Sequence, residues 1–213
     1  MKSFAEIAFT PAVQALQELH GSRAAYARMQ AEHGAGEGPG GREAAFLAAA
    51  DSFYLATVSE SGWPYVQHRG GPRGFLKVVS PTRLAFADFR GNRQFVSAGN
   101  AAGDDRVSII VMDYPNRRRL KLLGRLQFKG AQEADPALLR AVALPGYRAR
   151  IERVARIDLE AFDWNCPQHI TPRFDLAQIE AATRPLHTRI AQLESALAAA
   201  RGMAQASGAP PAG

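Results

Sequence analysis

A dense series of short β-type segments between residues 53 and 159 constrains the fold more than any other feature. These segments are rich in β-branched and aromatic residues, and Gly, Pro and Ser between them mark turns. No helical segment alternates with them, which excludes the βαβ pattern of a parallel sheet. About seven strands in roughly 110 residues favour a small closed or half-closed β-barrel. The expected strands are residues 53–59, 63–66, 74–80, 83–88, 106–112, 120–128 and 151–159.

Helical signals flank and interrupt this strand region, so the expected class is mainly β with flanking helices (α+β). Thr10 followed by Pro11 is typical of a helix start, and that helix is expected to continue toward Met29. A second helix is expected over residues 42–50, and a short one begins at Asp135.

The C-terminal part carries apolar residues at seven-residue spacings, which predicts a helix over residues 176–202. The stripe is too short for an autonomous coiled coil, so we expect it to pack on the domain or on a partner chain. Its members are Ile179, Leu186, Ile190, Leu193 and Leu197.

Together these signals divide the chain into four parts. An N-terminal helical extension with a glycine-rich linker at 33–41 covers residues 1–50, and the barrel covers 51–175. The C-terminal helix covers 176–202, and residues 203–213, rich in Ala, Gly and Pro, are expected to be disordered.

The composition excludes several classes of protein. Hydrophobic residues make up 46% of the chain and charged residues 22%, which rules out wholesale disorder. A single cysteine, Cys166, excludes an intramolecular disulfide and fits a reducing compartment. The sequence has no signal-peptide pattern and no apolar run of about 18 residues, so we expect a cytoplasmic protein without a membrane partner.

The net charge of +6 comes mainly from 22 Arg beside only 4 Lys. Guanidinium groups suit bidentate recognition of phosphates, although 40 Ala beside them fit a biased genome equally well. The positions of the arginines are more informative than their number. A glycine-rich junction at residues 69–74 carries Arg69 and Arg73, and residues 90–94 carry two more arginines where a helix begins. Both features favour a phosphate-bearing ligand over a merely solvated basic face.

Other candidate sites carry weaker signals. The basic run at residues 116–121 fits either a nucleic-acid patch or arginines that reach a cofactor. The five histidines have no metal-ligand spacing, so no metal site is expected. Cys166 is expected to be a small buried residue rather than a nucleophile. Because no acid–base pair stands out, a cofactor is expected to supply any chemistry.

In order along the chain, FYLATVSESGWPYVQHRGG, GFLKVV, LAFADFRGNRQF, DDRVSIIVMD, RRRLKLLGRLQF and FDWNCPQHITPRF resemble the pyridoxamine 5'-phosphate oxidase-like family, the FMN-binding split barrels. The resemblance spans residues 45–174 and implies a homodimer with FMN in a cleft between protomers. It implies phosphate contacts from Arg69, Lys77, Asn92, Arg93 and Gln94, and backbone contacts to the flavin from Gly74, Phe75 and Leu76. It also places Asp88 at the site, Arg119 as a residue supplied across the dimer, and Trp164 and Arg173 at the flavin edge.

The sequence also departs from the vitamin B6 oxidase. That enzyme's Arg-x-His substrate signature is missing, and Cys166-Pro167-Gln168-His169 stands there instead. The resemblance therefore implies an FMN-dependent oxidoreductase with a different small-molecule electron donor or acceptor. His169 is the candidate for catalytic proton transfer, although packing at the dimer interface explains it nearly as well. A flavin-binding sensor or stress protein without turnover is the alternative, and an arginine-rich nucleic-acid binder is less favoured.

Overall fold

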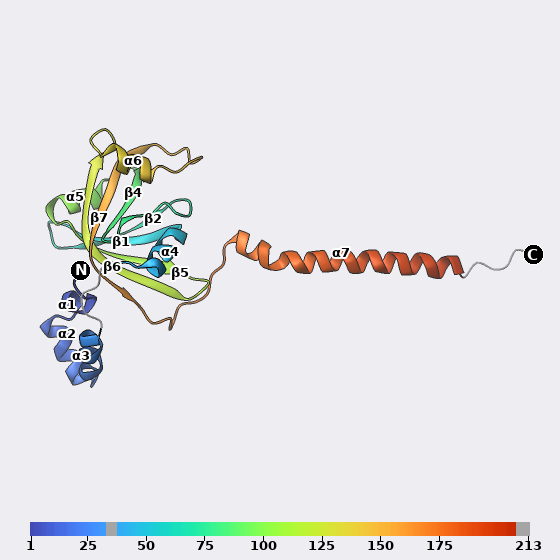
Figure 1. Ribbon diagram of the computed structural model, residues 1–213, viewed down its shortest axis with the longest axis horizontal. Helices are drawn as coiled ribbons and strands as arrows, with labels where there is room; N and C mark the ends of the chain where they lie inside the picture. Colours follow the sequence, from blue (N-terminus) through green and yellow to red (C-terminus); the bar gives the residue numbers. More distant parts are fainter. Residues whose placement is uncertain (33–37, 208–213) are drawn as a thin grey trace, which may run out of the picture. The chain divides into compact units, whose positions relative to one another are not determined.

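In the computed structural model, which describes residues 1–32 and 38–207, seven strands form one antiparallel sheet in the order β2-β1-β5-β6-β7-β4-β3 (Figure 1). Strands β2 and β3 are therefore its two edges. The expected split β-barrel with flanking helices is confirmed. The strands are β1 (Ser52–Val58), β2 (Pro64–Gly70), β3 (Lys77–Ser80), β4 (Arg83–Phe89), β5 (Arg106–Asp113), β6 (Arg118–Gly130) and β7 (Ile151–Trp164).

The barrel core follows from alternation along the strands. In β1, Phe53 and Leu55 are buried while Tyr54 between them is exposed, as expected for a strand with one face on the core. Phe53 stacks on Phe75 at 5.6 Å between ring centroids and meets Phe86 edge-on at 5.3 Å. This aromatic cluster joins β1 to β4 and to the segment before β3, which lie near opposite ends of the sheet.

Helix α4 (Gly41–Ala49) packs Phe46 and Leu47 into the core. Glu43 fixes its first turn, since one carboxylate oxygen accepts the Gly40 N–H at 3.1 Å and the other accepts the indole N–H of Trp164 at 2.7 Å. Burial alone would raise the pKa of the Glu43 carboxyl, but these hydrogen bonds and the charge of Arg42 bring it below its ordinary value.

Two more helices, α5 and α6, connect strands of the barrel along the chain. Helix α5 (Val96–Gly103) lies between β4 and β5. Helix α6 (Pro136–Val142) begins as predicted, because the Asp135 carboxylate accepts the N–H groups of Ala137 and Leu138.

The N-terminal region forms three helices where one long helix was predicted. Thr10 caps α2 (Pro11–Leu19) as expected, through its hydroxyl oxygen and the Val13 N–H. The helix then breaks at Gly21, whose φ of +72° is left-handed, before α3 (Arg23–Glu32). Helix α1 (Phe4–Ala8) was not predicted, although Ser3 and Glu6 form a capping box at its start.

The chain separates into two units, Met1–Ile170 and Thr171–Gly213. The second contains α7 (Leu176–Ser207), which begins where predicted but continues past the expected end at 202. Residues 203–207, predicted to be disordered, are therefore helical, and 208–213 lie outside the described residues. Residues 33–37 of the expected linker also lie outside them. The domain boundaries at 50 and 175 stay predictions.

The network around Glu43 predicts a pH-dependent contribution to stability. Glu43→Gln should lower the free energy of unfolding at pH 7 by about 1 kcal/mol, through a weaker cap and a weaker bond from Trp164. Because the folded pKa is depressed, this contribution is complete above the unfolded pKa of about 4.3 and is lost as pH falls through the lower folded value.

Denaturant unfolding of both proteins between about pH 7 and pH 3 measures this effect. The exposed Glu18 of α2 provides the control variant, Glu18→Gln. A stability gap between wild type and Glu43→Gln that stays constant across this range would contradict the assignment.

Candidate functional site

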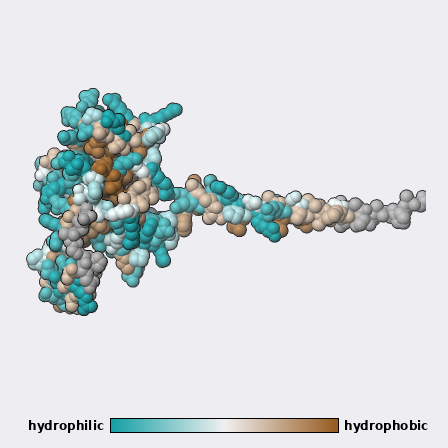
Figure 2. Space-filling model, viewed as in Figure 1, coloured by the Kyte–Doolittle hydropathy of each residue, from teal (hydrophilic) through white to brown (hydrophobic). Residues whose placement is uncertain are grey.

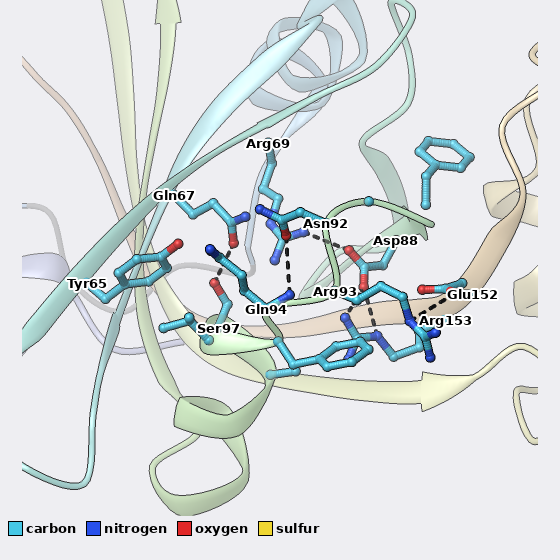
Figure 3. Close-up of a pocket in the computed structure, with 15 residues that line it drawn as sticks. Tyr65, Gln67, Arg69, Asp88, Asn92, Arg93, Gln94, Ser97, Glu152 and Arg153 are labelled. Carbon is cyan, nitrogen blue, oxygen red and sulfur yellow. Dashed lines mark hydrogen bonds and ion pairs between the residues drawn. The ribbon is translucent and has the colours of Figure 1, made fainter.

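A pocket lies where β2, the end of β4, the following loop, the start of α5 and the start of β7 meet (Figure 3). It is an open hollow of about 450 Å³. Its walls are largely polar, and five of the residues that the sequence predicted for a ligand line it. The lining residues are Tyr65, Gln67, Arg69, Asp88, Phe89, Gly91, Asn92, Arg93, Gln94, Phe95, Val96, Ser97, Ala98, Glu152 and Arg153.

Asp88 sits at the centre of the charge network in this pocket. One of its carboxylate oxygens accepts a hydrogen bond from Arg69 Nη1 at 2.7 Å, and the other accepts one from Arg153 Nε at 2.8 Å. Its side chain is only 5% exposed. A carboxylate so buried needs both guanidinium partners to offset the loss of water. The network also joins the edge strand β2 to β4 near the opposite edge of the sheet.

The guanidinium groups of both arginines, Arg69 and Arg153, lie close to aromatic rings. The Arg69 guanidinium lies 6.0 Å from the Phe86 ring centroid and 5.9 Å from that of Phe128. The Arg153 guanidinium lies 4.8 Å from Phe128 and the same distance from Phe95. Cation–π attraction therefore helps to hold the two planar groups in fixed positions.

The loop that precedes α5 has a strained backbone. Arg93 and Phe95 have φ values of 60° and 57°, a left-handed conformation that costs free energy for residues other than glycine. Phe95 also occupies the N-cap position, where it offers no side-chain acceptor to the first N–H groups of α5. Ser97 turns its hydroxyl to Gln67 Oε1 at 2.8 Å. A helix N-terminus without a side-chain cap, next to arginines, is suited to bind an anion.

The pocket is less positive than the basic residues of β2 to α5 predict. Asp88 neutralises much of the charge of Arg69 and Arg153, and Glu152 lies 3.8 Å from the guanidinium nitrogens of both Arg90 and Arg93. Arg93 has the most accessible guanidinium in the lining with a side chain 56% exposed. It is therefore the arginine best placed to meet an incoming anion.

Four predicted residues lie outside this pocket, at the entry to β3. Phe75 and Leu76 are buried in the core, and the backbone N–H groups of Gly74 and Phe75 donate to Ala50 and Pro72. Glycine at 71 is required by packing, since a Cβ there would lie 2.9 Å from the Phe75 side chain. The space beside Gly71 is thus filled by the Phe75 side chain. Lys77 begins β3 and pairs in register with Ala85.

Trp164 and His169, the predicted C-terminal residues of the first unit, are not among the residues that line the pocket. Trp164 packs on α4, with its N–H donated to Glu43 and the Arg42 guanidinium 4.5 Å from its ring centroid. His169 is exposed and has a left-handed φ of 62°. Arg173 belongs to the second unit. Cys166 is exposed, so the expectation of a buried cysteine was wrong: it follows the end of β7, in a segment that runs along the surface.

The basic run at residues 116–121 does not act as one patch. Arg118 pairs with Asp113 at 2.9 Å and lies over the Phe46 ring, whereas Arg119 pairs in register with Met112 on the other face of the sheet. Within the described chain, Arg119 Nε is buried without a hydrogen-bond partner. This arrangement gives little support to a nucleic-acid site.

Within residues 1–32 and 38–207, no group of three or more His, Cys, Asp or Glu side chains is arranged to hold a metal ion. Among the helices of this same part of the chain, none has the length and apolar character needed to cross a bilayer.

Comparison with known proteins gives the family. A sequence model described as pyridoxamine 5'-phosphate oxidase matches residues 41–161, which cover most of the barrel. The fold together with this match defines a split β-barrel protein with flanking helices. The chain belongs to the pyridoxamine 5'-phosphate oxidase-like family. No curated protein matches it.

Several solved structures resemble the chain. A putative pyridoxamine 5'-phosphate oxidase from Lactobacillus delbrueckii is 17% identical, with a TM-score of 0.46, over 60% of this chain and 95% of that one. An FMN-binding protein from Syntrophomonas wolfei is 11% identical, with a TM-score of 0.44, over 57% and 81% of the two chains. The Agrobacterium tumefaciens protein Atu2129, of unknown function, is 25% identical, with a TM-score of 0.40, over 68% and 65%.

Sequence reasoning missed several residues that the structure brings to the pocket. Alternation along β2 was a usable signal, since Tyr65, Gln67 and Arg69 share one face of that strand. Arg153 and Glu152 had no such signal, because their place depends on the pairing of β7 with β4, where Asp88 faces Arg153.

The buried network predicts a large effect of Asp88 on stability. Asp88→Ala leaves Arg69 and Arg153 without their counter-charge, so the free energy of unfolding should fall by about 3 kcal/mol. Denaturant titration of the purified variant measures it.

Asp158→Ala is the matched control, because Asp158 accepts an equally short bond from Arg83 but in a pair that is far more exposed. Its cost should stay below about 1 kcal/mol. Equal losses in the two variants would show that the Asp88 network has no special structural role.

Proposed function

We propose that this chain binds FMN and works as an FMN-dependent oxidoreductase on a small-molecule substrate, with the FMN bound where two copies of the chain meet. The family supports this proposal, and so does the pocket at the start of α5. When bound, FMN supplies hydride and electron transfer, and the protein supplies binding and orientation.

The uncapped start of α5 beside Arg93 carries the proposal. The first N–H groups of the helix receive no side-chain acceptor from Phe95, and the pocket walls add the Asn92 and Gln94 amides. Among the described atoms, Arg69 Nε is also a buried donor without a partner. A dianionic phosphate matches such a set of donors, so the residues present fit the phosphate end of FMN.

We propose the following roles for the remaining residues. Asp88 fixes the Arg69 and Arg153 guanidinium groups so that little ordering is needed when the phosphate arrives. We also propose the flavin contacts that the family resemblance implies. The residues concerned are Gly74, Phe75, Leu76, Lys77, Trp164 and Arg173. His169 is proposed to exchange a proton between its imidazole and the substrate.

A second copy is proposed to cover the outer face of β1, β2 and β5. Here Tyr54, Val58 and Val66 are 37%, 40% and 60% exposed, and the adjacent Trp63 is 76% exposed. These residues form one contiguous region, because Tyr54 pairs with His68 and with Ile110, and Val58 with Pro64. An exposed apolar region of this kind is typical of an interface. Arg119, which pairs with Met112 on this face, is then positioned to reach the partner's flavin.

One assay distinguishes an FMN-dependent oxidoreductase from a flavin-binding protein without turnover. If the chain is an oxidoreductase, the yellow holoprotein should be bleached anaerobically by NAD(P)H or another donor and regain its colour with an acceptor. A holoprotein that binds FMN but is neither reduced nor reoxidised across a panel of donors and acceptors would instead be a flavin-binding sensor.

The phosphate assignment predicts a selective loss of affinity. Arg93→Ala should raise the Kd for FMN at least about tenfold, because one charge-assisted contact contributes roughly 1.5–3 kcal/mol. Lys77→Ala tests the family-based assignment in the same way.

Quenching of FMN fluorescence on titration gives these constants. Arg83→Ala is the control, since Arg83 pairs with Asp158 outside the pocket. If the Arg93 and Arg83 variants bind FMN equally well, the site has been misplaced.

The shared-cleft assignment predicts an effect of Val66, which lies on the proposed dimer face of the edge strand β2, between the pocket residues Tyr65 and Gln67. Val66→Lys should weaken FMN binding by impairing dimerisation, because binding and assembly are linked equilibria. Far-UV circular dichroism checks that the variant remains folded. Leu19→Lys, at a residue of α2 that is 77% exposed, is the control. Unchanged FMN affinity in Val66→Lys would argue against a cleft shared by two copies.

A further inference from the structure

Helix α7 carries a stripe of mostly apolar residues, in which Thr183 is the one polar member. From Leu176 onward the residues of this stripe are spaced alternately three and four apart, the pattern of the a and d positions of a coiled coil. The stripe extends over roughly three and a half heptads, which is longer than the seven-residue spacings alone indicate. Its members are Leu176, Ile179, Thr183, Leu186, Ile190, Leu193, Leu197 and Ala200.

The stripe is largely exposed in the single chain. Its six large members expose between 48% and 78% of their surface, and Figure 2 shows hydrophobic residues among hydrophilic ones at the surface of α7. An isolated helix of this kind gains most of its stability from packing of its apolar face. Pro185 lies at an outer position of the heptad pattern, so it does not interrupt the stripe.

We propose that this stripe pairs with α7 of a second copy of the chain, as an antiparallel two-stranded coiled coil. In this alignment Ile190 packs against Leu193 of the second copy, and Leu186 packs against its Leu197. Each contact occurs twice because the pair is symmetric. The apolar core is then built from the part of the helix that follows Pro185.

The charges that flank the stripe select the second copy and its direction. The antiparallel alignment places Glu180 beside Arg201 of the second copy, and His187 beside its Glu194, again twice each. In a parallel pair, Arg189 would meet Glu194, but Asp175 at the helix start would meet Glu180, and two carboxylates would repel. Asp175 is fixed there, because its carboxylate accepts the Gln178 N–H at 2.7 Å.

Disulfide trapping tests this pairing in the full-length chain. Cys166→Ser removes the native thiol. In that background, Ile190→Cys with Leu193→Cys should give a covalent dimer under mild oxidation, visible on a non-reducing gel. Two cysteines three residues apart on one helix have Cβ atoms about 5–6 Å apart, too far for an internal disulfide.

The control is Thr188→Cys with Ser195→Cys, at exposed positions on the opposite side of the helix. It measures random collision, including any that an association of the barrels produces. The stripe pair should form the interchain bond at least about tenfold faster than the control, because coiled-coil pairing raises the effective thiol concentration. Ile190→Cys alone should crosslink slowly.

Two outcomes would overturn the proposal. Equal crosslinking rates for the stripe pair and the control would mean that something other than a second α7 covers the stripe. Rapid crosslinking of Ile190→Cys alone would mean that like residues face each other, which contradicts the antiparallel alignment.

Discussion

The ion network of Arg69, Asp88 and Arg153 is the interaction on which the site depends. A carboxylate whose side chain is 5% exposed needs partners of opposite charge to offset its loss of water, and here the partners come from β2 and β7. Because β2 is an edge of the sheet and β4 lies beside the other edge, the network joins the two ends of the open barrel. The loop that leads to α5 begins directly after β4, so its starting position is set by the same contact.

This arrangement divides the arginines of the pocket into two kinds. Arg69 and Arg153 are held by Asp88 and lie close to aromatic rings. They therefore contribute mainly to the shape of the pocket and to a fixed electric field within it. Arg93 is half exposed and only weakly paired with Glu152 at 3.8 Å, so it contributes a charge that an anion can use. The strained backbone at Arg93 and Phe95 turns this arginine and the uncapped start of α5 toward the same space.

The barrel could be predicted from the sequence because its signals are local. Aromatic and β-branched residues mark β1, alternation of apolar and polar residues marks much of β6, and Thr10-Pro11 and Asp135-Pro136 mark helix starts. Arg69 and Arg93 were predicted for the same reason, since they lie at a strand junction and a turn, whereas Asp88 was predicted only through the family resemblance. Arg153 was not found, because only the register between β4 and β7 brings it to Asp88. The indole N–H of Trp164 is donated to Glu43, a contact between residues far apart in the chain that no local pattern reveals.

The central claim is that the start of α5 and its neighbouring arginines bind the phosphate of FMN. Calorimetric titration of the apoprotein with FMN and with riboflavin, which has the same ring system but no phosphate, tests this claim most directly. Two charge-assisted contacts of about 1.5 kcal/mol each predict that FMN binds roughly a hundredfold more tightly. Equal affinity for the two flavins would contradict the account.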